Sequence, residues 1–181
     1  MPGLVTALKR LFRAILHWRA MRGPAGLFDP DYYRAEYSEA SRIGPWLHFI
    51  VAGAYQGCNP HPLFDTAFYL EKYPDVRQSG INPLLHYVLH GAAEGRKPHP
   101  LFEPAYYLSR CPEARGRNPL AYFLRSTGED CRSPHPLFDC EAYLQSRPEL
   151  AGRDVNPLAH FLRFDRGVSA ATEGGQFGCV S

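Results

Sequence analysis

The sequence lacks an apolar run that approaches the roughly 20 residues of a membrane-spanning helix. It also lacks the glycine-rich GxxxxGKS or GxxxxGKT loop that cradles phosphate groups, so no nucleotide or phosphosulfate site of that kind is indicated. Five cysteines are present, but they form no CxxC pair, and their odd count does not indicate a disulfide framework. We therefore interpret the cysteines as reduced thiols and expect a cytoplasmic protein.

Acidic residues are missing from the N-terminal segment. Of the 20 Lys and Arg residues, five lie in residues 1–22, and the remainder of the chain holds the other 15 with all 18 acidic residues. The net charge of +2 is too small to indicate nucleic-acid binding, and the aromatic residues do not follow the basic ones. We expect no nucleic-acid partner.

Apolar residues recur with helical spacing in this basic segment, which predicts an amphipathic helix over residues 1–24. Such a helix can lie on an anionic bilayer surface, here the inner membrane, or it can pack on the first repeat or on a partner protein. The residues expected to contact the membrane or the partner are Leu4, Leu8, Lys9, Arg10, Leu11, Phe12, Arg13, Ile15, Trp18 and Arg22.

The phrase PHPLF occurs three times, at residues 60–64, 98–102 and 134–138, and we name these segments joints 1 to 3. Around them the chain aligns as four copies, over about residues 27–62, 63–100, 101–136 and 137–164. A phrase that recurs at a nearly constant period indicates a repeated structural unit, whereas a catalytic motif normally occurs once. The tail, residues 165–181, is small and polar, and we expect it to be flexible.

Each copy predicts two short helices. An acidic N-cap follows Leu-Phe in the first half, and an Asn-Pro pair begins the second half of copies 2 to 4. The first-half acids are Asp29, Asp65, Glu103 and Asp139. We interpret Gly53 and Gly91 as left-handed residues that close the second helices. These second helices are apolar nearly all round, so they should be buried between neighbours.

The predicted fold is therefore all-α: an array of about four short helix-pair repeats with an N-terminal amphipathic helix. No joint follows copy 4, which is consistent with a C-terminal cap of the array.

The combination of Leu-Phe-Asp, YPDV, NPLxHY and PHPLF over about residues 25–164 resembles a helical repeat of bacterial proteins. That repeat is often found beside glycosyltransferase or sulfotransferase domains of surface-polysaccharide pathways. The resemblance implies a role accessory to polysaccharide biosynthesis and carries over no catalytic or cofactor residue.

Two patterns are candidates for chemistry. Asp29-Pro30-Asp31 spells the DxD pair of many glycosyltransferases, but the first acid recurs in every copy and the second mostly does not, which favours helix capping. Histidines recur in the joints and in the second helices, where they are either metal ligands and general bases or structural residues. We prefer the structural interpretation, in which each joint histidine donates to a carbonyl freed by its flanking prolines.

We accordingly expect a non-catalytic interaction module with no metal or other cofactor and a protein partner that the sequence does not name. Two alternatives stay open, a small glycosyltransferase- or sulfotransferase-related enzyme and a soluble helical scaffold without membrane contact.

Overall fold

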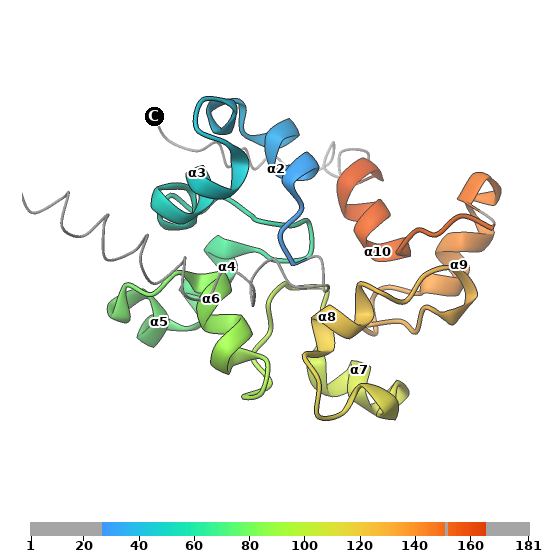
Figure 1. Cartoon of the computed structure of the whole chain (residues 1–181). Helices are drawn as coiled ribbons and strands as arrows, with labels where there is room; N and C mark the ends of the chain where they lie inside the picture. Colours follow the sequence, from blue (N-terminus) through green and yellow to red (C-terminus); the bar gives the residue numbers. More distant parts are fainter. Residues whose placement is uncertain (1–26, 151, 166–181) are drawn as a thin grey trace, which may run out of the picture.

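The computed structural model describes residues 27–150 and 152–165, and within these ranges it contains helices and loops and no β-strand (Figure 1). The predicted all-α class is confirmed, whereas the number of repeats stays a prediction. The predicted N-terminal helix and the tail beyond residue 165 lie outside the described residues.

The helices follow one another in the order of the aligned copies. Copy 1 contains α2 (Pro30–Glu36), η1 (Ser38–Ser41), α3 (Pro45–Val51) and η2 (Gly53–Tyr55). Copy 2 contains α4 (Thr66–Lys72), α5 (Pro74–Ser79), α6 (Pro83–His86) and η3 (Tyr87–Gly91). Copy 3 contains α7 (Pro104–Arg110), η4 (Pro112–Ala114), α8 (Pro119–Phe123) and η5 (Gly128–Asp130). Copy 4 contains α9 (Cys140–Gln145), η6 (Pro148–Leu150), α10 (Pro157–His160) and η7 (Phe161–Asp165).

Local capping explains where these helices begin. The carboxylate of Asp29 accepts hydrogen bonds from the N–H groups of Asp31 and Tyr32 at 3.0 and 2.9 Å, and Asn82 caps α6 through the N–H of Leu85 at 3.1 Å. These bonds satisfy donors that have no partner within the helix. Glu103 is different, since it makes no side-chain cap and pairs with Lys97 instead.

Three aromatic rings pack together in every copy, with centroids 5.3 to 6.0 Å apart. The first ring is the Phe of the Leu-Phe pair, and the second is the tyrosine of the first helix. The third ring comes from the second half of the copy. This spacing is typical of stabilising edge-to-face and tilted contacts. The triplets are Phe28, Tyr33 and Phe49; Phe64, Tyr69 and Tyr87; Phe102, Tyr107 and Phe123; and Phe138, Tyr143 and Phe161.

The first-helix tyrosine also joins the two helices of a copy through a hydrogen bond. The hydroxyl of Tyr33 lies 2.8 Å from Nδ1 of His48, and the hydroxyl of Tyr69 lies 3.0 Å from Nδ1 of His86. Tyr143 and His160 repeat this pair at 2.8 Å. In copy 3 the aligned histidine is replaced by Tyr122, and the buried hydroxyl of Tyr107 has no hydrogen-bond partner of good geometry within the described residues.

Gly53 and Gly91 do not adopt the predicted left-handed conformation, because neither has a positive φ. A Cβ atom at Gly53 would clash with the hydroxyl oxygen of Tyr33, and one at Gly91 would clash with that of Tyr69. Glycine is therefore needed at these positions for the close approach of the tyrosine.

The sequence predicted that the second helices are buried all round. In the structure they are buried on one side only. Leu84 is fully buried, whereas Leu89 in the next turn and Leu47 in α3 are 37% and 39% exposed. The four copies follow an arc that brings α10 beside α2 (Figure 1). An ion pair between Arg163 and Asp29, at 3.3 Å, connects copy 4 to copy 1.

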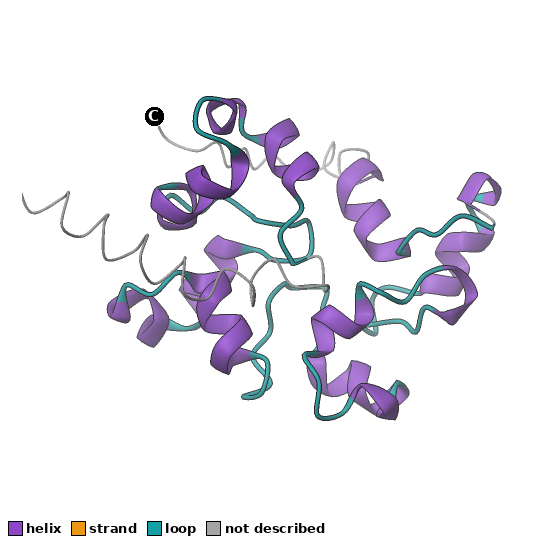
Figure 2. Cartoon of the chain, in the orientation of Figure 1, coloured by secondary structure: helices purple, strands orange, loops and turns teal. Residues whose placement is uncertain are grey.

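The joints run toward the middle of this arc (Figure 2) and fold back on themselves. The backbone N–H groups of Leu63, Leu101 and Leu137 donate to Nδ1 of the histidine two residues earlier, at 3.0 to 3.1 Å. Each joint histidine thus holds the turn of its own joint, and its Nδ1 accepts a backbone N–H, whereas we expected a bond to a carbonyl. The geometry requires an Nδ1 atom without a proton.

We predict that the tyrosine hydroxyls differ in their effect on stability. Tyr69→Phe leaves Nδ1 of His86 without its partner and should lower the free energy of unfolding by about 1 to 3 kcal/mol. Tyr107→Phe removes a buried hydroxyl for which the described residues offer no partner of good geometry, and this change should be neutral or stabilising. Urea unfolding of both variants tests this difference, and equal losses of stability would contradict it.

We also predict that stability falls in mild acid because of His61. Burial lowers the pKa of His61 from 6.5 to about 4. The negative charge of Asp29 opposes this shift, and the positive charge of Arg163 adds to it. Because the folded pKa lies below the unfolded value, the stabilisation is complete above pH 6.5 and is lost as the pH falls toward 4, by on the order of 3 kcal/mol.

His61→Asn keeps an acceptor in the side chain and removes the titration. Unfolding midpoints measured between pH 4 and 7 should therefore vary less in this variant than in the natural chain. If His61→Asn changed nothing, the acid sensitivity would have another origin.

Candidate interaction site

Each of the first three copies is hydrogen-bonded to the joint that follows it. The backbone N–H of Asp29 donates to the carbonyl of Pro60 at 2.9 Å, and that of Asp65 donates to Pro98 at 2.9 Å. Glu103 donates to Pro134 in the same way at 3.0 Å. The acidic residue after Leu-Phe thus begins its helix and also anchors the next joint.

Copy 4 has the same Leu-Phe-Asp segment but no joint after it. Within the described residues, the backbone N–H of Asp139 donates to no acceptor. Leu137 is 81% exposed, whereas its counterparts Leu27 and Leu63 are 2% and 0% exposed. We name the Leu137 side chain and the Asp139 backbone N–H the open edge of copy 4.

This exposed leucine changes the interpretation of copy 4 as a cap. The terminal repeat of an array normally presents a polar outer face to water. Here the large apolar side chain of Leu137 faces solvent instead. The open edge therefore combines one exposed apolar side chain with one backbone donor that has no acceptor in the described part of the chain.

A cavity of about 560 Å³ lies where copy 3 meets copy 4. Four charged side chains contribute to its wall, together with the apolar Leu144 and Leu150 and the thiol-bearing Cys131. The charged residues are Arg110, Arg132, Asp139 and Glu141. Groups of both signs allow this cavity to form ion pairs with a small polar molecule.

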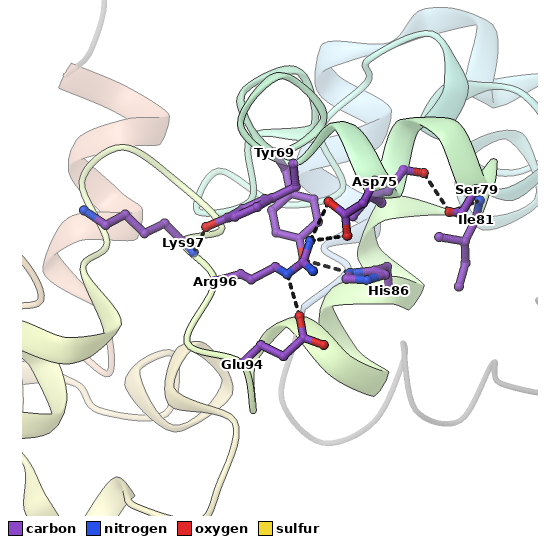
Figure 3. Close-up of polar contacts among 10 residues, drawn as sticks. Tyr69, Asp75, Ser79, Ile81, His86, Glu94, Arg96 and Lys97 are labelled. Atoms are coloured by element: carbon purple, nitrogen blue, oxygen red, sulfur yellow. Dashed lines mark hydrogen bonds and ion pairs between the residues drawn. The ribbon is translucent and has the colours of Figure 1, made fainter.

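A polar cluster at the end of copy 2 has a different role (Figure 3). The Arg96 guanidinium binds Asp75 at 2.8 Å and Glu94 at 2.5 Å and lies 4.8 Å from the centre of the Tyr73 ring. Its hydrogen bond holds the pKa of Asp75 below the usual value, and burial followed by the Arg96 charge lowers the pKa of His86. These contacts fasten α5 to the segment that leads into joint 2.

The DxD acids both have partners within the described residues. Asp29 caps the helix and contacts Arg163, and Asp31 forms an ion pair with Arg34 at 2.9 Å. Within the described residues, no group of three or more His, Cys, Asp or Glu side chains is arranged to hold a metal ion. The geometry of α2 thus supports helix capping as the role of this pair.

The predicted membrane or partner contacts between Leu4 and Arg22 lie outside the described residues, so their position stays a prediction. The open edge was missed at the sequence level, although its signal was present as the missing joint after copy 4. The contact between Cys131 and Cys140 was also missed, because these cysteines occupy positions that do not match between copies.

In the part of the chain that the structure describes, no helix is long and apolar enough to cross a membrane. Comparison of the chain with protein-family models, with curated proteins and with solved structures gave no match.

Proposed function

We propose that this chain is a non-catalytic helical-repeat interaction module and that the open edge of copy 4 binds an extended, proline-containing segment of a protein partner. One observation carries this proposal. Three Leu-Phe-acid segments each bind a Pro-His-Pro segment of the same chain. In the fourth, the leucine is exposed, and the same backbone donor has no acceptor among the described residues.

The chemistry of the joints defines the segment that would fit. It would offer a carbonyl to the Asp139 N–H and an apolar surface to Leu137, as the proline of each joint offers its carbonyl to the preceding copy. Proline restricts the free segment to extended conformations, which lowers the entropy lost on binding.

The energy available from the open edge is modest. Burying one leucine contributes about 1.5 to 3 kcal/mol, and one backbone hydrogen bond adds about 0.5 to 1.5 kcal/mol. Association costs several kcal/mol in lost translational and rotational freedom. A stable complex therefore needs further contacts beyond the open edge.

We further propose that the module is peripheral to the inner membrane and accessory to surface-polysaccharide biosynthesis. The membrane contact is supported by the amphipathic pattern and the five cations of residues 1–22. The pathway is supported by the resemblance of the repeat to those found beside glycosyltransferase and sulfotransferase domains.

A peptide of residues 96–103, which contains joint 2, tests the open edge. We expect saturable binding of the fluorescently labelled peptide to the full chain, measured by anisotropy. Leu137→Asp should weaken it about tenfold or more, because the variant loses the apolar contact, a change of about 1.4 kcal/mol. Leu89→Asp, at the partly exposed Leu89 of copy 2, should leave binding unchanged.

A peptide with the same composition in scrambled order is the second control. Equal binding of the natural chain and Leu137→Asp, or equal binding of the scrambled peptide, would refute the open edge as a docking site.

Sedimentation with lipid vesicles tests the membrane contact. Each cation near an anionic surface contributes about 1 kcal/mol, so the chain should sediment with phosphatidylserine-containing vesicles and not with neutral ones. High salt should weaken the binding, and deletion of residues 1–22 should abolish it without unfolding the repeats. If the deletion instead lowers the melting temperature and the intact chain ignores anionic vesicles, the segment packs on the repeats.

A further inference from the structure

Two buried cysteines that flank joint 3 contact each other. The Sγ atoms of Cys131 and Cys140 are 3.1 Å apart, and the side chains belong to residues that are 8% and 1% exposed. This distance is longer than the ~2.05 Å of a disulfide bond and corresponds to two thiols in direct contact. Little movement would be needed to join them.

A similar contact closes the segment around joint 1. There the Thr66 hydroxyl donates to the carbonyl of Cys58 at 2.8 Å, which ties the first residue of α4 to the start of the joint. Cys140 is the residue aligned with Thr66 and is likewise the first residue of its helix, α9. Cys131 directly precedes Arg132, the residue aligned with Cys58, so a bond from Cys140 to Cys131 would close joint 3 one residue away from the corresponding point.

The cavity between copies 3 and 4 provides a route to this pair. Cys131 contributes to its wall, between the basic residue Arg132 and the turn at Gly128, while Cys140 is not among the lining residues. A small oxidant that enters the cavity would therefore meet Cys131 first. Cys140, whose sulfur contacts that of Cys131, is in position to attack the oxidised Cys131.

We propose that Cys131 and Cys140 are a reversible dithiol–disulfide pair that reacts with hydrogen peroxide and covalently closes joint 3. The Cys131 thiolate attacks one peroxide oxygen, breaks the O–O bond and becomes a sulfenic acid, and the released hydroxide takes up a proton to form water. The Cys140 sulfur then attacks the sulfenic sulfur, and a second water leaves. In total, two thiols lose two protons and two electrons, and one peroxide becomes two water molecules.

The surroundings of the pair set its pH dependence. The hydrogen bond with the Cys140 thiol, followed by burial and the Coulombic effect of Cys140, raises the pKa of Cys131. Since the thiolate is the attacking species, oxidation should be slow at neutral pH and faster in alkaline solution. The charged side chains that line the cavity beside the pair are Arg110, Arg132, Asp139 and Glu141.

Intact-mass and peptide analysis of the full chain tests the proposal. The reduced protein is treated with hydrogen peroxide, its free thiols are alkylated, and it is digested with trypsin, which cleaves after Arg132 and separates the two cysteines. We expect a Cys131–Cys140 cross-linked peptide, faster formation at alkaline pH, and complete reversal by dithiothreitol. The oxidised chain should melt a few degrees higher than the reduced chain, because the bond restricts the unfolded state.

Cys131→Ser and Cys140→Ser should each abolish the cross-link and the rise in melting temperature, whereas the matched control Cys58→Ser should keep both. Circular dichroism verifies that the variants fold, and the readout on the natural chain does not depend on any variant. Separate alkylation of Cys131 and Cys140 after oxidation, or cross-links mainly to Cys58, Cys111 or Cys179, would overturn the proposal. These readouts do not involve peptide binding, so they are independent of the proposed docking at the open edge.

Discussion

The contact on which each copy depends is the packing of the first-helix tyrosine against two other rings. A short helix has too few hydrogen bonds to be stable alone, so tertiary packing must hold it. In copy 1 the Tyr33 ring packs on Phe28 and Phe49, and its hydroxyl reaches His48 in the second helix. The same hydroxyl excludes a side chain at Gly53. Thus one buried residue fixes the partner helix, the histidine and the glycine together.

The copies are connected by a second recurring interaction, which runs from the backbone N–H of the acidic residue to the proline carbonyl of the next joint. Because this interaction needs a following joint, it ends at copy 4. The consequence is an exposed Leu137 beside an Asp139 N–H that has no acceptor in the described part of the chain. The proposed docking site therefore follows from the way in which the copies hold one another.

The cysteines and histidines illustrate how far residue types alone can indicate chemistry. His61 suits a metal or a proton transfer by its type, yet its ring is buried and its Nδ1 accepts the N–H of Leu63. Cys131 and Cys140 are nine positions apart and do not match between copies, but the fold of joint 3 brings their sulfur atoms into contact. Comparison of the copies identified residues that recur and hold the fold together. It did not reveal the thiol pair, because this pair occurs at a single joint.

The sequence by itself determined the helical class and most helix starts, because caps such as Asp29 and Asn82 bind N–H groups two or three residues away. Such local bonds depend on residue type and spacing alone. Only the tertiary structure decided why Gly53 is glycine, which face of each second helix is buried, and that Leu137 is exposed. The buried helix face and the exposure of Leu137 depend on which surfaces distant segments cover. The need for glycine at position 53 depends on Tyr33, which lies 20 positions earlier. Contacts of this kind are not encoded in any short stretch of residues.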